Sequence, residues 1–389
     1  MRRQLAALFL FCVIDTLGFG ILVPLVPYMA ARFGTPPEFI TPVLGSYSLC
    51  QLLAAPWWGR LSDRYGRRPI LISSLAGACV SYLVLGLADN LTWMFVSRIL
   101  GGFMAGNISA AFAYASDVSL PEKRAASLGM VGAAIGIGFT LGPAIGGLLV
   151  GNDFHAANFV LPAVVSASLS IGAILLVTFF LPESNTTERR REHASLERIG
   201  PLRLLQERPG LRLMAAATLL VTFAQANLES ILGLWALNKF GFGPRTVGLL
   251  MFCLACLAVL MQGGGVRALV PKLGEGRLAM LGVLAYAVGL ATVAGAPNLA
   301  VTGLGLALCG IGFGSFNPSA SSLASKQAAD HDRGAVMGTY QSSNSLARVI
   351  GPFVSGPLYA GLGPSAPFLV GACVMLPAIW FVRRVAKRA

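Results

Sequence analysis

The chain has 389 residues, of which 55% are hydrophobic and only 12% are charged. Soluble domains carry about 25% charged residues, so this composition excludes a set of ordinary soluble domains and predicts an all-α integral membrane protein. The net charge of +13 does not indicate nucleic-acid binding, because the basic residues stand in short runs between apolar segments. That placement is typical of membrane topology.

Apolar runs of about 20 residues predict helices that cross the membrane. The first run contains Asp15 and is too long for the apolar region of a signal peptide, so we expect it to be a span. Twelve spans are expected in all, at residues 5–29, 41–59, 70–88, 92–114, 126–149, 159–181, 211–235, 246–265, 278–296, 299–321, 335–357 and 365–382.

The distribution of lysine and arginine predicts the orientation of these spans. With the N-terminus in the cytoplasm, the outer loops contain only Arg32, Lys239 and Arg245, and the other basic residues outside the spans lie inside. Because the number of spans is even, the C-terminus is then cytoplasmic as well. We expect a multi-pass protein of a bacterial cytoplasmic (inner) membrane.

The longest polar connection follows the sixth span and divides the chain into two halves. We expect six-helix bundles at 1–182 and 211–389, joined by a cytoplasmic linker at 183–210. The later part of this linker has the composition of an amphipathic helix.

The two halves resemble each other at an offset near 209 residues. GFMAGNISAA at 102–111 matches GFGSFNPSAS at 312–321, and the Gly-Pro pairs at 142–143 and 351–352 also correspond. This pattern predicts a six-plus-six duplication, the parallel repeat of one large class of secondary transporters.

Four segments resemble motifs of the major facilitator superfamily. GRLSDRYGRRP at 59–69 resembles its cytoplasmic signature, and GFTLGPAIGG at 138–147 resembles its antiporter motif. Residues 98–106 resemble its span-four motif, and residues 15–27 resemble the first span of the proton-coupled drug exporters, tetracycline exporters among them. The resemblance implies two six-helix bundles and secondary active transport by alternating access, with no cofactor and no enzymatic activity.

The resemblance also implies a gate on the cytoplasmic side, in which Asp63 and Arg67 form a latch, with Asp117 as a third member. The second copy, PKLGEG at 271–276, lacks the aspartate that corresponds to Asp63, so we expect the latch to rest mainly on the first half. Glycine at 59 and 66 would let the backbone turn tightly beside Asp63. The gate residues expected in full are Gly59, Asp63, Arg64, Gly66, Arg67, Arg68 and Asp117.

The fifth span carries glycines that favour close helix packing. Gly138, Gly142 and Gly146 are four residues apart and so share one face of a helix, and Pro143 would bend it. Together with Gly147 they predict a gating interface between the halves; plain small-residue packing is the alternative.

Proton coupling requires a group that changes charge inside the membrane, and intramembrane ionisable residues are rare. All three histidines lie in loops, which leaves Asp15 in the first span and Glu229 in the seventh as candidate carboxylates. Arg98 and Arg348 are the candidate intramembrane cations, and we expect at least one acid to pair with one of them. The alternative is a static ion pair that joins two helices.

Spans one, four, seven and ten line the central cavity in transporters of this superfamily. Polar side chains here would face the substrate, or would instead hydrogen-bond between helices. Tyr286 and Ala258 stand near the places where tetracycline exporters carry ionisable residues, so tetracycline–metal exchange is not expected. The expected cavity residues are Phe19, Gln51, Asn107, Gln225, Asn227, Asn317 and Gln341.

These features favour a proton-coupled antiporter that exports a small hydrophobic or amphipathic compound. The alternative is a proton symporter or facilitator for a metabolite or lipid. An ATP-driven pump is not expected, because the sequence has no phosphate-binding G-x-x-x-x-G-K-[ST] loop. All seven cysteines lie in apolar stretches, so we expect packing residues and no metal site, and we expect a monomer without nucleic-acid partners.

Overall fold

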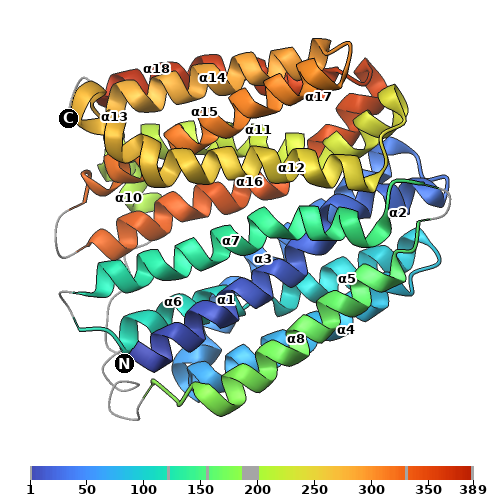
Figure 1. Cartoon of the computed structure of the whole chain (residues 1–389). Coiled ribbons are helices and arrows are strands. Elements are labelled where there is room, and N and C mark those ends of the chain that lie inside the picture. The colour runs from blue at the N-terminus through green and yellow to red at the C-terminus, as the bar shows by residue number, and fades with distance from the viewer. Residues whose placement is uncertain (1, 121–122, 155–156, 186–200, 329–331, 387–389) are drawn as a thin grey trace. The chain divides into compact units, whose positions relative to one another are not determined.

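The computed structural model describes residues 2–120, 123–154, 157–185, 201–328 and 332–386, which are built from helices and short connections (Figure 1). Most of the expected linker, residues 186–200, lies outside the described residues. Its end forms the short helix α10 (Pro201–Glu207), followed directly by α11 (Pro209–Phe240).

The chain forms two compact units, each described here by itself. The first comprises the described residues of Met1–Thr35, Ser46–Leu196 and Phe242–Leu249, and the second those of Pro36–Gly45, Glu197–Gly241 and Leu250–Ala389. The division of the chain into bundles at 1–182 and 211–389 remains a prediction.

In the first unit, α1 and α7 pack along each other in the same direction, and α4 packs against both α5 and α8 (Figure 1). Its elements are α1 (Arg2–Leu22), η1 (Val23–Leu25), α2 (Val26–Arg32), most of α3 (Pro37–Tyr65), α4 (Arg67–Gly86), α5 (Leu91–Met104), α6 (Asn107–Asp117), α7 (Arg124–Val150) and α8 (Val160–Phe180).

The second unit is organised around two helix pairs, α14 with α15 and α11 with α16. Besides α10 and α11, it contains most of α12 (Pro244–Leu260), η3 (Met261–Gly265), α13 (Val266–Leu273), α14 (Glu275–Gly295), α15 (Leu299–Ser325), α16 (Arg333–Leu362), α17 (Ala366–Cys373) and α18 (Met375–Ala386).

Eleven helical stretches in the described part are long and apolar enough to cross a membrane. They correspond to eleven of the twelve expected spans. The remaining one, 335–357, is helical within α16, but its first half is rich in serine, asparagine and glutamine, which lowers its hydropathy. A count of twelve membrane crossings therefore remains a prediction.

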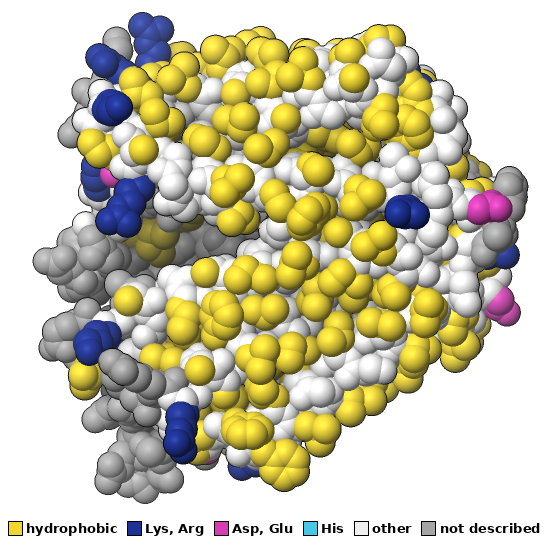
Figure 2. Space-filling model, in the orientation of Figure 1, with side chains coloured by type: hydrophobic (Ala, Val, Ile, Leu, Met, Phe, Trp, Pro, Cys, Tyr) yellow, Lys and Arg dark blue, Asp and Glu magenta, His cyan; other side chains and the backbone are white. Residues whose placement is uncertain are grey.

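The surface of the helices is suited to lipid. Large apolar side chains such as Leu53, Phe179 and Leu260 are 70%, 74% and 68% exposed, which in water would be an unusually costly surface. In Figure 2 hydrophobic side chains cover the broad face shown, and most of the visible Lys and Arg side chains gather at one end of the helices. This apolar band identifies an integral membrane protein.

The fourth expected span is interrupted between α5 and α6, and a serine of a neighbouring helix stabilises the break. Ser74 on α4 donates a hydrogen bond to the Met104 carbonyl, and its oxygen accepts from the backbone N–H of Gly106 (3.0 Å) and Asn107 (3.1 Å). These bonds satisfy backbone groups that the break leaves without helical partners. The break sets Asn107 at the first residue of α6.

Candidate functional site

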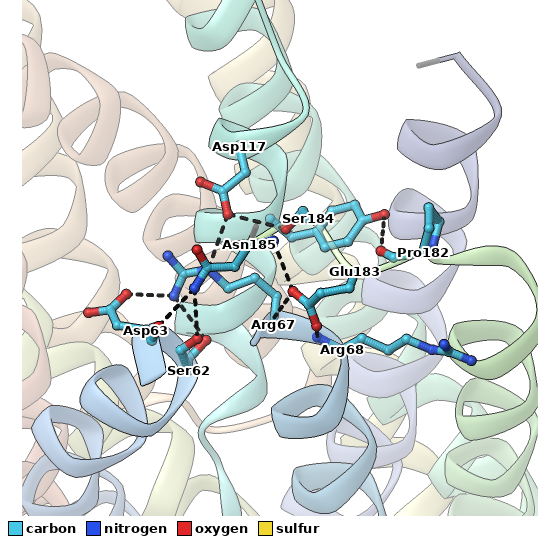
Figure 3. Close-up of polar contacts among 10 residues, drawn as sticks. Ser62, Asp63, Arg67, Arg68, Asp117, Pro182, Glu183, Ser184 and Asn185 are labelled. Atoms are coloured by element: carbon cyan, nitrogen blue, oxygen red, sulfur yellow. Dashed lines mark hydrogen bonds and ion pairs between the residues drawn. The ribbon is translucent and has the colours of Figure 1, made fainter. Parts of the chain in front are cut away.

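Arg67 lies at the centre of a polar cluster at the start of α4 (Figure 3). Its side chain is only 6% exposed. Nη1 donates to Asp63 Oδ1 (2.7 Å) and to Ser62 Oγ (3.0 Å), and Nε donates to Asp117 Oδ2 (3.1 Å). The guanidinium thus connects the end of α3, the start of α4 and the end of α6 through charge-assisted hydrogen bonds. The structure brings together the three residues expected to form the latch.

A fourth segment completes this cluster, and sequence reasoning missed it. The Glu183 carboxylate, just after α8, accepts hydrogen bonds from the backbone N–H of Arg67 (2.8 Å) and Arg68 (3.1 Å). These are orphan donors of the first turn of α4, so Glu183 caps that helix and complements its dipole. Ser184 Oγ also donates to Asp117 Oδ2 (3.2 Å).

Asn185 binds the other side of the same turn. Its Nδ2 donates to the backbone carbonyls of Ser62 (3.3 Å) and Asp63 (2.9 Å) at the end of α3. The segment after α8 therefore satisfies both the last carbonyls of one helix and the first amides of the next. The signal in the sequence was an acid placed directly after the sixth span, in a stretch that otherwise has the composition of a linker.

The remaining gate residues differ in their surroundings. Gly66 has φ 111°, a conformation that favours glycine, and it is the residue before α4. Gly59, however, lies inside α3, so the expected tight turn at that position is wrong: the helix continues to Tyr65. Arg64 is exposed and its guanidinium lies 5.3 Å from the centre of the Tyr65 ring, whereas Arg68 donates to the Thr178 carbonyl (2.5 Å).

The second unit has an ion pair at the equivalent place, with the charges reversed. Gly274 (φ 76°) precedes α14 as Gly66 precedes α4, and the next residue is Glu275 instead of an arginine. Lys326 Nζ, at the end of α15, lies 2.8 Å from Glu275 Oε2, and Ser322 Oγ donates to Oε1 (2.8 Å). The repeat therefore retains an ionic contact between these helices although it has lost the aspartate.

A second ion pair joins the beginnings of two helices in the same unit. Arg208, immediately before α11, donates from Nη1 to Asp332 Oδ1 (3.2 Å) and to the Gln327 carbonyl (2.7 Å), and from Nη2 to Asp332 Oδ2. The Asp332 side chain is 3% exposed. This bidentate pair ties the start of α11 to the connection before α16.

The first of the two candidate proton-binding acids, Asp15, is buried on α1. Asn107, at the break between α5 and α6, lies beside the carboxyl as its hydrogen-bond partner. An asparagine amide is a neutral partner, so the carboxyl can exchange a proton without disrupting an ion pair. Asn107, expected to line the cavity, is thus also the hydrogen-bond partner of an acid.

Arg98 on α5 is 1% exposed, and among the described residues no ion pair joins it to Asp15 or Glu229. Its Nε and Nη2 donate no hydrogen bond to any part of the chain that the structure describes. The guanidinium carbon lies 6.0 Å from the centre of the Tyr47 ring. Tyr82 interacts electrostatically with both Arg98 and Asp15.

The second candidate acid, Glu229 on α11, belongs to a chain of hydrogen bonds. Gln225 Nε2, one helical turn earlier, donates to Glu229 Oε1 (2.7 Å), and the hydroxyl of Tyr286 on α14 donates to Gln225 Oε1 (2.6 Å). Tyr286 is fully buried. Its contact with Gln225 was not expected, because nothing in the local sequence around residue 286 indicates a partner on α11.

The other expected cavity residues have separate surroundings. Asn227 Nδ2 donates to the Pro367 carbonyl (3.0 Å), which is a contact between helices. Gln341 is exposed and accepts from Asn344 Nδ2 (3.2 Å), while Gln51 and Asn317 are half-buried. Phe19 stacks on Tyr47 with ring centres 4.6 Å apart. Arg348, the other expected intramembrane cation, is exposed.

The glycine face of α7 packs directly on α1. A Cβ added at Gly138 would lie 2.7 Å from the Leu17 nitrogen, one at Gly142 would lie 2.6 Å from the Gly20 Cα, and one at Gly146 would meet the Ile21 carbonyl. These three glycines are therefore packing residues within the first unit.

Gly147 and Pro143 complete the expected motif. A Cβ at Gly147 would lie 2.7 Å from the Pro244 carbonyl and 3.0 Å from the Arg245 Cα, and both of those residues belong to the same unit. Pro143 lies inside α7. A gating role for this helix remains a prediction.

Comparisons with known proteins place this arrangement among membrane transporters. A family model described as Major Facilitator Superfamily matches residues 8–352 and 214–389. The chain is 29% identical to tetracycline resistance protein, class G, of Vibrio anguillarum, with 99% of this chain and 98% of that protein aligned. It is 27% identical to major facilitator superfamily domain-containing protein 10 of Mus musculus, over 99% of this chain and 94% of the mouse protein.

The solved structures give the same fold. The crystal structure of the human organic anion transporter MFSD10 (TETRAN) is similar at a TM-score of 0.71 and 26% identity, covering 98% of this chain and 99% of the other. The similarity extends over nearly the whole length of both chains, so it includes both units.

Proposed function

Since this chain belongs to the Major Facilitator Superfamily, we propose that it is a proton-coupled antiporter that exports a small hydrophobic or amphipathic compound by alternating access. It is a membrane transporter and not an enzyme, and its substrate is a small molecule. The coupling to protons, the direction of transport and the chemistry of the substrate are the proposed parts.

The observation that carries the proposal is the environment of Asp15 and Glu229. Each carboxyl lies on a helix long and apolar enough to cross the membrane, and each has a neutral amide partner, Asn107 or Gln225. An amide partner can donate to a charged carboxyl and accept from a neutral one, so it accommodates either form. Two such groups, one in each unit, are suited to bind and release protons during a transport cycle.

The Arg67 cluster supports alternating access. An arginine held between two carboxylates at the ends of three helices is an interaction that forms or breaks as a unit, because breaking one part leaves a buried charge unpaired. We infer that this cluster, on the cytoplasmic side of a bacterial inner membrane, is intact in one conformation of the cycle and broken in another. Proton and substrate binding would shift the population between these conformations.

The test uses purified full-length protein in proteoliposomes that contain a pH-sensitive dye. When ethidium or tetracycline is added outside, an antiporter exchanges entering substrate for protons and raises the internal pH. A symporter lowers the internal pH instead, so the sign of the response distinguishes the two mechanisms. Protein-free liposomes give the baseline for passive permeation.

The variants Asp15→Asn and Glu229→Gln test the coupling. We expect at least one of them to abolish the substrate-induced pH change while the protein still inserts and folds. If both variants respond like the parent, the proposed coupling through these carboxyls is wrong.

A further inference from the structure

Arg98 has a combination of properties that the proposed proton coupling does not explain. It is a permanently charged side chain, 1% exposed, on a helix in an apolar environment. Nε and Nη2 find no acceptor in the described part of the chain, and no acid there forms an ion pair with it. Burying guanidinium N–H groups without acceptors is costly, so a residue with a purely structural role would be expected to have acceptors for them.

The surrounding helices hold Arg98 firmly in place. Ser81 on α4 donates to the Ser97 carbonyl (2.8 Å), and Ser97 Oγ donates to the Ser81 carbonyl (2.7 Å), so the residue before Arg98 is fixed from both sides. A Cβ at Gly101 would lie 2.5 Å from Ser81 Oγ, which shows how closely α5 and α4 approach. The backbone that carries Arg98 is therefore fixed, which reduces the part of the entropic cost of binding a ligand that comes from ordering the helices.

Aromatic rings surround the same place. The Tyr47 ring lies 6.0 Å from the guanidinium carbon, and Phe19 stacks on Tyr47 from α1. Phe139 on α7 packs edge-on against Phe19 with ring centres 5.7 Å apart. Tyr82 is close to Arg98, Tyr47 and Asp15. A buried cation beside several rings fits a ligand with an anionic group and an apolar, aromatic body.

We propose that Arg98 binds the carboxylate of an organic acid whose apolar part packs against Phe19, Tyr47 and Tyr82. The planar fork of an arginine matches a carboxylate with two parallel hydrogen bonds. Asp15 does not occupy this position, because its partner is Asn107. Since Arg98 is buried in this conformation, the ligand reaches it when the helices part during alternating access, and in this respect the inference rests on the proposed function.

Binding of 2-naphthoate to the purified full-length protein in nanodiscs tests the proposal by calorimetric titration. The neutral analogue 2-naphthamide has the same rings without the charge, so we expect it to bind at least 10-fold more weakly. Arg98→Gln should weaken naphthoate binding about 10- to 100-fold, because charge-assisted hydrogen bonds are lost. Arg98→Lys keeps the charge but loses the fork and should give a smaller loss.

Arg32→Gln is the matched control, since it removes one positive charge at a residue whose Nη1 donates to the Ala157 carbonyl at a helix end. It should leave naphthoate binding unchanged. Thermal unfolding separates a binding role from a structural one: because Nε and Nη2 of Arg98 lack acceptors in the described part of the chain, Arg98→Gln should unfold at or above the temperature of the parent. Equal affinity for naphthoate and naphthamide, or unchanged naphthoate binding by Arg98→Gln, would overturn the proposal, and so would a large loss of stability in both Arg98 variants.

The binding measurement requires no proton gradient, so its outcome is independent of the coupling. Naphthoate binding through Arg98 without any substrate-induced pH change would contradict the proposed antiport and leave the anion site intact. Proton-coupled transport of ethidium, together with equal affinity for naphthoate and naphthamide, would support the proposed antiport and overturn the anion site.

Discussion

Arg67 and Glu275 occupy equivalent positions in the two repeats and carry opposite charges. Each is the first residue of a helix, after a glycine of positive φ, and each forms an ion pair with a residue at the end of another helix: Arg67 with Asp117, and Glu275 with Lys326. The repeats have thus retained the contact and exchanged its polarity. The second half therefore also carries an ionic contact. That the latch rests mainly on the first half, whose cluster is the more buried, remains a prediction.

The difference in burial predicts a difference in stability. Arg67→Gln removes a cation that is 6% exposed and bonded to both Asp63 and Asp117, which should cost about 3–5 kcal/mol. Glu275→Gln affects a pair in which the lysine is 56% exposed, and should cost about 0–1 kcal/mol. Thermal unfolding of the two purified variants measures both. A larger loss for Glu275→Gln than for Arg67→Gln would contradict the assignment of the first cluster as the stronger latch.

Asp63 should affect the transport cycle more than substrate binding. Its carboxylate, near the end of α3, accepts from Arg67 at 2.7 Å, whereas Asp15 lies on α1 and Asn107 at the start of α6. If this contact forms in only part of the cycle, as proposed, Asp63→Asn lowers turnover and leaves the affinity for substrate nearly unchanged. Initial transport rates and equilibrium binding measure the two quantities separately, and equal losses in both would contradict a latch.

The sequence predicted the spans because a bilayer requires about 20 apolar residues for each crossing, and this signal is local. It also predicted that Asp63, Arg67 and Asp117 meet, through the resemblance of residues 59–69 to a known motif. Glu183 and Asn185 were missed because their partners lie on the turn between α3 and α4, more than 110 residues earlier. A contact of such separation depends on how the helices pack, which no local pattern records.

The contact between Glu275 and Lys326 was missed for another reason. PKLGEG has no aspartate at the position of Asp63, but an ionic contact requires only a pair of opposite charges in either order. Similarly, α16 is helical over the span expected at 335–357, but polar residues such as Gln341, Asn344 and Arg348 lower its hydropathy. In both cases the result depends on which side chains pair and which helices pack together, and a local sequence pattern records neither.

Glu183 should stabilise the turn through its cap on α4. Glu183→Gln keeps the size of the side chain but replaces one acceptor oxygen with a donor and removes the charge, so it should cost about 0.5–2 kcal/mol. Arg203→Gln is a suitable control because that residue is 75% exposed and pairs only with Glu207 in the described part. Equal unfolding temperatures for Glu183→Gln and the parent would contradict a stabilising cap by Glu183 on α4.

Tyr286 should act on transport through Gln225. Tyr286→Phe preserves the ring but leaves Gln225 Oε1 without its buried donor, and Gln225 is then freer to turn away from Glu229. We expect the rate of proton-coupled transport to fall about 10-fold. Tyr359→Phe is the matched control, since its hydroxyl accepts from Asn238 and not from this network. Equal rates in both variants would show that the hydrogen-bond chain does not position Glu229.

The contact between α7 and α1 allows a matched pair of glycine substitutions on one helix. A Cβ at Gly142 would lie 2.6 Å from the Gly20 Cα, and the rigid backbone of α1 cannot move away cheaply, so Gly142→Ala should lose about 1–3 kcal/mol. Gly136, within the same helix, has nothing within 4 Å of an added Cβ, and Gly136→Ala should gain about 0.5–1 kcal/mol from the higher helix propensity of alanine. Thermal unfolding of both variants gives the two signs. If Gly142→Ala is as stable as Gly136→Ala, α7 does not need the close approach that its glycines provide, and these positions tolerate a methyl group by moving the helices apart.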